Sequence, residues 1–188
     1  WRSDSKRQEY LLKVLRSVLN GLGSLSTPIL VFPLVDESSI TYSEEGELMS
    51  FLENIEDDLA INGIKIAFES DYPPKELKRF IDQFNPEFYG INYDIGNSAA
   101  LGFDVNEEFS SYGDRILNVH VKDRPLGGTT VPLGDGNADF KTVFSKLSEY
   151  GYKGNYILQP ARDSSGQHSQ AIKNYLDMTI DWISQYES

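Results

Sequence analysis

Short apolar runs alternate with longer amphipathic segments along the whole chain of 188 residues. The short runs have the composition of buried strands, and in the longer segments apolar residues recur at helical spacing. The predicted strands are 28–32, 64–69, 88–94, 116–121 and 156–159, and the predicted helices are 5–22, 43–63, one that starts at Pro73-Pro74, 106–112, one around 140–147, and 169–186. This α(βα)₅ order predicts a parallel sheet with right-handed crossovers. The run 28–32 is apolar throughout, so we expect that strand to be buried on both faces.

Two architectures have this order of elements, an open doubly wound sheet and a TIM barrel. No glycine-rich fingerprint follows an early strand, which disfavours the doubly wound sheet. A complete barrel has about 250 residues, or roughly 30 for each βα unit, and the units here have that size. The sequence therefore predicts an α/β TIM barrel of which only the C-terminal five βα units are present, as a single domain over 1–188 with the N-terminal strands 1–3 absent. The chain begins with Trp1 rather than Met. We expect upstream residues or another chain to cover the open flank.

Composition excludes several classes of function. Lys and Arg number 17 against 29 Asp and Glu, giving a net charge of −12. Because nucleic acid binding needs a basic surface, no nucleic acid partner is expected. No apolar run is long enough to span a bilayer, so no membrane partner is expected. Cysteine is absent, which excludes thiolate metal sites and is compatible with a cytoplasmic protein.

Four of the predicted strands end on a polar residue that can bind a ligand. They are Glu69, Asp94, His120 and Gln159. Each separation is long enough for a loop, a helix and the next strand, so in a parallel sheet the four side chains would converge at one edge. Two carboxylates, an imidazole and an amide in one place suggest a site for a divalent metal.

Each of these residues also has a structural explanation. Glu69 could cap a helix or pair with an arginine, and Asp94 could form an Asx turn. A single histidine in a strand is often a core residue. His120, however, alternates with Asn118 and Lys122 on one face of an otherwise apolar strand. Polar groups that point into a barrel are costly unless they are paired or bind a ligand, which favours the metal site.

Four motifs then carry a resemblance to a known family. They are FES (68–70), YDIGNSAA (93–100), NVHVKD (118–123) and VPLGDGNADF (131–140). In this order and spacing they resemble the sugar-phosphate isomerase/epimerase branch of the xylose-isomerase-like TIM barrels, in particular L-ribulose/L-xylulose-5-phosphate 3-epimerases and hexulose-phosphate isomerase-like proteins. The resemblance covers the whole chain and implies that its strands are the fourth to eighth of the barrel.

The resemblance also implies a ligand set and a catalytic pair. In that family Glu, Asp, His and Glu hold a divalent cation, and the matching positions here are Glu69, Asp94, His120 and Gln159. The epimerases use the first and last glutamates as paired acid/base groups, so Glu69 and Gln159 occupy the catalytic positions. Gln159 departs from the pattern, because an amide oxygen can coordinate Mn²⁺, Zn²⁺ or Mg²⁺ but cannot shuttle a proton. Metal binding is expected to be weakened, or absent if Gln159 does not ligate.

Further residues are candidates for substrate binding. Asn97 matches a position where the family's tagatose-type epimerases have a substrate-binding histidine. Loops late in a TIM barrel often bind phosphate, and the nearest candidate anion partners are Lys122, Arg124 and Arg162. The glycine-rich loop 124–137 either approaches the substrate with its backbone or is a surface loop.

Two residues near these candidates have other expected roles. Asp123 is expected to support the metal site or to cap a strand end. His168 is expected in an exposed loop.

The favoured function is a metal-dependent sugar or sugar-phosphate isomerase/epimerase, in which Glu69 removes a proton alpha to a carbonyl and the metal is a Lewis acid. The alternative is a non-catalytic barrel relative that binds a sugar or a protein partner, because Gln159 replaces a catalytic glutamate. A metallo-phosphodiesterase of the endonuclease IV type needs more histidines and a basic face, and the two histidines and the charge of −12 argue against it. The expected partner is a small sugar or sugar phosphate, and a homo-oligomer remains open.

Overall fold

The sheet winds in one direction, from the first strand to the last. A computed structural model describes residues 1, 2 and 4–186. Within them one parallel sheet has the order β1 (Ile29–Leu34), β2 (Lys65–Ser70), β3 (Tyr89–Asp94), β4 (Ile116–Val121) and β5 (Asn155–Leu158). A doubly wound sheet reverses its strand order at a switch point, whereas a barrel does not. The strictly sequential order therefore confirms the barrel prediction.

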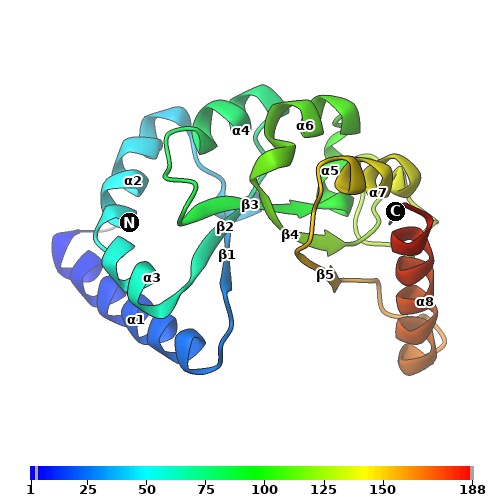
Figure 1. Cartoon of the computed structure of the whole chain (residues 1–188), viewed down its shortest axis with the longest axis horizontal. Helices are drawn as coiled ribbons and strands as arrows, with labels where there is room; N and C mark the ends of the chain where they lie inside the picture. Colours follow the sequence, from blue (N-terminus) through cyan, green and yellow to red (C-terminus); the bar gives the residue numbers. More distant parts are fainter. Residues whose placement is uncertain (3, 187–188) are drawn as a thin grey trace.

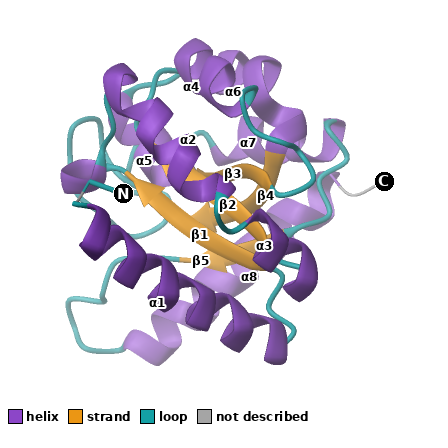
Figure 2. Ribbon diagram, turned by 90° about the vertical axis from the view of Figure 1, so that its left-hand side faces the viewer, coloured by secondary structure: helices purple, strands orange, loops and turns teal. Residues whose placement is uncertain are grey.

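The helices form an arc on the outer side of the sheet (Figure 1). They are α1 (Ser5–Ser24), α2 (Glu45–Glu53), α3 (Glu56–Asn62), α4 (Pro74–Ile81), α5 (Ile95–Leu101), α6 (Val105–Tyr112), α7 (Phe140–Glu149) and α8 (His168–Tyr186). Figure 1 shows α1 and α8 at opposite flanks of the arc, while no helix of the described residues covers the concave side of the sheet. Figure 2 views the sheet from its β1 side. The fold is a partial barrel, and none of the helices among the described residues has the length and apolar character to cross a membrane.

The region 43–63, predicted as one helix, forms two. Helix α2 ends at Glu53 and α3 begins at Glu56. At the break, the side-chain amide of Asn54 donates to the carbonyl of Ser50 at 2.7 Å. Such side-chain bonds to the backbone compete with helix continuation. The prediction was wrong here because the apolar spacing continues through the break.

The first strand is less buried than its composition predicts. Most of β1 is only partly buried, and Pro33 is exposed. The reason is its place at an edge of the open sheet, where β1 pairs with β2 alone among the described residues. The other edge is similar, since Ile157 on β5 is 43% exposed. The prediction of burial on both faces was therefore wrong, because it assumed a neighbouring strand at each edge of β1.

An aromatic cluster between the sheet and α4 fixes β2. The ring of Phe68 lies 5.4 Å from Phe80, 5.0 Å from Phe84 and 5.9 Å from Tyr89, measured between centroids. All four side chains are buried. Because successive side chains of a strand point to opposite faces, the burial of Phe68 towards the helices turns Glu69 towards the inside of the barrel.

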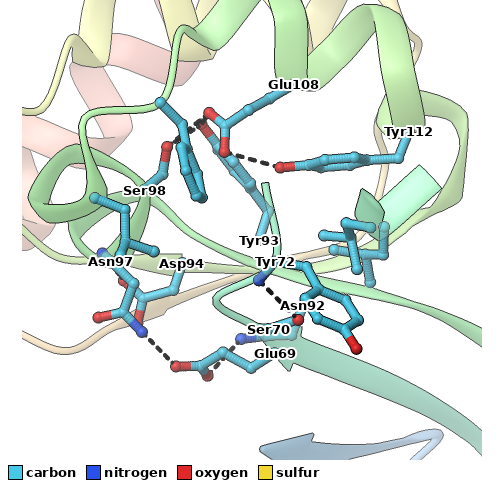
Figure 3. A pocket seen from close by; sticks show the side chains of 14 residues that line it. Glu69, Ser70, Tyr72, Asn92, Tyr93, Asp94, Asn97, Ser98, Glu108 and Tyr112 are labelled. Atoms are coloured by element: carbon cyan, nitrogen blue, oxygen red, sulfur yellow. Dashed lines mark hydrogen bonds between the residues drawn. The ribbon is translucent and has the colours of Figure 1, made fainter. Parts of the chain in front are cut away.

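A buried carboxyl group ties α6 to β3 and α5. Glu108 is 1% exposed. It accepts hydrogen bonds from the hydroxyls of Tyr93 at 2.8 Å, Ser98 at 2.6 Å and Tyr112 at 2.8 Å (Figure 3). Burial raises the pKa of Glu108 above its usual range in spite of these donors, and the charge of Asp104 acts in the same direction. The carboxyl group is thus harder to ionise in the folded protein than in the unfolded chain.

The Glu108→Gln substitution is expected to change the pH dependence of stability. Below the usual pKa of 4.5 the wild-type carboxyl is protonated in both states, and Gln resembles it in shape. As the pH rises through the raised folded-state pKa, the wild type loses stability relative to the variant, because its folded state gives up a proton that it binds more tightly. Urea unfolding from about pH 4 to about pH 9 measures this difference. Parallel curves for the two proteins would contradict it, and Glu107→Gln, whose side chain is 43% exposed, is the control.

Candidate metal centre

Three of the four strand-end residues meet at one place. One ligand atom from each of Glu69, Asp94 and His120 lies within 4.8 Å of the others. His120 Nδ1 is 3.3 Å from Glu69 Oε2 and 3.7 Å from Asp94 Oδ2. The register explains this, since Asp94 pairs with His120 across β3 and β4. We call these three residues the triad.

The charges of the triad are strongly coupled. Burial alone would lower the pKa of His120, but hydrogen bonding and charge from Asp94 and Glu69 raise it to about 9. Burial would raise the pKa of Asp94, yet His120 and Lys122 together hold that pKa below its usual range. The Asp94 carboxylate thus stays ionised beside a positive group. A divalent cation could take the place of that positive charge, so the donor set of two carboxylates and one imidazole fits such an ion.

Asp94 has two roles at once. Its Oδ1 accepts a hydrogen bond from the backbone N–H of Asn97 at 2.8 Å, which caps helix α5, while its Oδ2 faces His120 and Lys122. Asp94 can therefore cap helix α5 with one carboxylate oxygen while its other oxygen keeps the position expected of a metal ligand. Helix α5 was missing from the sequence prediction because its first residue, Ile95, is followed by Gly96 and Asn97, which are poor helix formers. Gly96 is needed, since a Cβ there would lie 2.7 Å from the Lys122 side chain.

Asn97 connects the triad to two basic residues. Its Nδ2 donates to Glu69 Oε1 at 2.7 Å, and its Oδ1 accepts from Lys122 Nζ at 2.9 Å and from Arg124 Nη1 at 2.7 Å. Lys122 Nζ also lies 3.0 Å from Asp94 Oδ2. The candidates Asn97, Lys122 and Arg124 therefore lie together beside the triad.

Gln159 and Arg162 lie further along the open edge. Gln159 directly follows β5, is exposed, and donates its backbone N–H to Val121 at 3.0 Å. Strand alternation puts it on the same face as Ile157, the register partner of His120. Arg162 is exposed and lines a separate hollow beside α8. His168 is exposed as predicted, but it begins α8 rather than lying in a loop.

The glycine-rich loop is anchored by Asp123, which is 1% exposed. Its carboxylate accepts backbone N–H bonds from Gly134 at 2.8 Å, Gly136 at 2.9 Å and Ala138 at 3.1 Å. A Cβ at Gly136 would lie 2.1 Å from Asp123 Oδ1, so only glycine fits. Asp123 is therefore an anchor of the loop, and the loop is an organised structure beside the site.

Sequence reasoning missed Asn92, which also contacts the triad. Its Nδ2 donates to Glu69 Oε2 at 2.9 Å, and Figure 3 shows both amides, Asn92 and Asn97, directed at the two oxygens of Glu69. A hollow runs from Glu69 past Asn92 towards Glu108. The sequence held a signal for Asn92, because this polar residue stands two positions before Asp94 and therefore on the same inward face of the strand. Asn118 stands in the same relation to His120 on the next strand.

Sequential parallel strands, an outer layer of helices and the triad at three neighbouring strand ends define a TIM-type barrel with a candidate metal site. The sequence matches the model of the xylose isomerase-like TIM barrel over residues 4–184, so the chain belongs to that family. This confirms the family to which the motifs pointed.

The relatives include inosose dehydratases and L-ribulose-5-phosphate 3-epimerases. An inosose dehydratase from Lacticaseibacillus casei is 27% identical over 173 residues, which are 77% of this chain and 58% of that protein. The L-ribulose-5-phosphate 3-epimerase UlaE of Escherichia coli O1:K1 / APEC is 38% identical over 77 residues, 40% of this chain and 27% of the relative. The matched part spans about half the length of the inosose dehydratases.

Solved structures share the fold. The IOLI protein with a bound zinc atom matches 100% of this chain and 74% of its own, with a TM-score of 0.82 and 21% identity. A xylose isomerase domain protein from Planctomyces limnophilus matches 93% of this chain and 66% of its own, with a TM-score of 0.76 and 19% identity. The chain thus shares the barrel fold of these proteins.

Proposed function

We propose that the protein is a metal-dependent isomerase or epimerase of sugars or sugar phosphates. The observation that carries the proposal is the convergence of Glu69, Asp94 and His120 within 4.8 Å at the carboxyl ends of three strands. Active sites of this barrel lie at that end. The relatives named above support the substrate class.

The donor set suits Mn²⁺, Zn²⁺ or Mg²⁺, with Glu69, Asp94 and His120 as ligands and the amide oxygen of Gln159 as a fourth. When bound, such an ion polarises a carbonyl oxygen as a Lewis acid. Lys122 already pairs with Asp94, and Gln159 is neutral. We therefore expect weaker metal binding than a site with three carboxylates would have.

Glu69 is the proposed general base, which takes a proton from the carbon alpha to the substrate carbonyl. Its two oxygens are held by Asn92 and Asn97, so the carboxylate is fixed before substrate arrives. Gln159 cannot act as the second base. The proposed chemistry is thus one-base isomerisation, in which Glu69 returns the proton to the neighbouring carbon of the substrate while the hydroxyl proton passes to the former carbonyl oxygen, so that no atom is gained or lost.

Asn97, Lys122 and Arg124 are the proposed substrate contacts. Arg124 donates through Nε and Nη2 to the carbonyl of Gly128 at 2.9 and 2.7 Å, and through Nη1 to Asn97. These bonds hold the Arg124 guanidinium beside Asn97, which supports the proposal that it binds a hydroxyl or phosphate of the substrate. Arg162 is proposed as a further anion partner.

The alternative is a non-catalytic barrel that binds a sugar or a protein partner. The exposed Gln159 in place of an acid/base glutamate favours it. The two proposals differ in one respect, because only a catalyst exchanges substrate hydrogens with solvent. For either function we propose a cytoplasmic location and a small-molecule partner.

The test is deuterium incorporation from D₂O. The protein is loaded with Mn²⁺, Zn²⁺ or Mg²⁺ and incubated with ketoses, ketose phosphates and inososes, and mass spectrometry follows the uptake of deuterium. Metal-dependent uptake that stops when a chelator is added is the expected result. No uptake with any metal and any of these compounds would favour the non-catalytic alternative.

A further inference from the structure

Two buried asparagines face one another below the triad. Asn92 is 2% exposed and Asn118 is 3% exposed, and the two are register partners across β3 and β4. Asn118 Nδ2 donates to Asn92 Oδ1 at 2.6 Å. An amide carries its acceptor and its donors on different atoms. The bond to the oxygen of Asn92 therefore fixes the direction of its nitrogen.

The nitrogen of Asn92 points at the triad. It lies 2.9 Å from Glu69 Oε2 and 3.1 Å from His120 Nδ1, two atoms that are themselves 3.3 Å apart. An amide nitrogen is a donor without a free lone pair, so it cannot be a metal ligand. It can hold the carboxylate, and Asn97 holds the other oxygen of Glu69 from above at 2.7 Å.

A purely structural role explains this pair poorly. Two buried amides cost desolvation that an apolar pair in the barrel interior would avoid. The strands pair through their backbones from Asn92 to Asp94, after a register shift between Ile91 and Asn92. The side-chain bonds run from Asn118 to Asn92 and end on Glu69, so their effect is on the orientation of that carboxylate.

We propose that Asn92, held by Asn118, is a positioning residue that sets the Glu69 carboxylate relative to His120 in the metal centre. The proposal rests on the proposed metal-dependent function. Loss of a group that orients metal ligands typically weakens metal binding by about 10- to 100-fold. The same loss changes the ligand geometry, which the visible spectrum of bound Co²⁺ reports.

The test is a Co²⁺ titration of the full chain, followed by absorption spectroscopy. Asn92→Leu keeps the volume and removes the donor. Asn118→Val and Asn118→Thr have matched shapes, but only Thr keeps a polar donor. We expect about 10- to 100-fold weaker Co²⁺ binding and shifted absorption bands in Asn92→Leu and Asn118→Val, with a smaller loss in Asn118→Thr. Tyr112→Phe, which removes a buried hydrogen bond to Glu108, is the control and should keep the wild-type spectrum.

Wild-type affinity and spectrum in Asn92→Leu and Asn118→Val would overturn the proposal, and so would equal losses in Asn118→Val and Asn118→Thr. If Asn92→Leu fails to fold, the two Asn118 variants decide, because Asn118 makes its bond to Asn92 rather than to the triad. Absence of Co²⁺ binding in the wild type would contradict the proposed function itself. Wild-type binding with unchanged variants would contradict only the positioning role.

Discussion

The Glu69→Gln variant, loaded with metal, is expected to exchange substrate hydrogens with D₂O about 10²- to 10⁴-fold more slowly than the wild type. The amide has nearly the same shape as the carboxylate but cannot accept the proton. The new NH₂ group would also face the donor nitrogen of either Asn92 or Asn97, both of which donate to Glu69 in the wild type. Because one of these hydrogen bonds is lost, some loss of metal affinity is expected. The exchange rate is therefore measured at saturating metal.

Glu149→Gln is the matched control for this experiment, because the Glu149 side chain is 60% exposed on α7 and pairs with Lys146. Its exchange rate should equal that of the wild type. If Glu69→Gln exchanged hydrogens as fast as the wild type at saturating metal, Glu69 would not be the base.

The Gln159→Glu variant is expected to bind a divalent cation about 10- to 100-fold more tightly than the wild type. In the proposed site, with Gln159 as a ligand, the substitution adds a negative charge near a doubly charged ion, and at separations of about 4 Å such a charge contributes several kcal/mol before desolvation is subtracted. Gln159 is exposed, so that desolvation is small. Isothermal titration with Mn²⁺ or Zn²⁺ measures the change.

Gln185→Glu adds the same charge at an exposed position near the end of α8, and separates a local effect from the change in net charge. Its metal affinity should stay at the wild-type value. Equal affinities of Gln159→Glu and Gln185→Glu would contradict the placement of Gln159 at the metal.

The sheet could be predicted from sequence because its strands carry strong local signals. Ile116–Val121 has the predicted bounds, and the segment alternates apolar side chains with Asn118 and His120, with Lys122 next in the alternation. The convergence of Glu69, Asp94 and His120 followed from parallel neighbours alone, because residues at the carboxyl ends of such strands share one edge.

Other features depend on partners that a linear pattern does not contain. The short helix at 95–101 has Gly96 and Asn97, which favour turns, as its second and third residues, and it is stabilised by the Asp94 cap. The partial exposure of β1 follows from the open edge of the sheet. The anchor role of Asp123 depends on three N–H groups that lie 11, 13 and 15 residues further along the chain.

The metal content of the purified full chain tests the central claim most directly. Elemental analysis should find about one divalent ion per chain in the wild type and none in Asp94→Ala, because that substitution removes a carboxylate of the triad. Asp104→Ala is the matched control: it removes an equivalent helix cap, in which the backbone N–H of Glu107 donates to Asp104 Oδ1 at 2.9 Å, without touching the triad, and should retain the metal. A wild type without a divalent ion, or Asp94→Ala with an undiminished metal content, would contradict the assignment of this site as a metal centre.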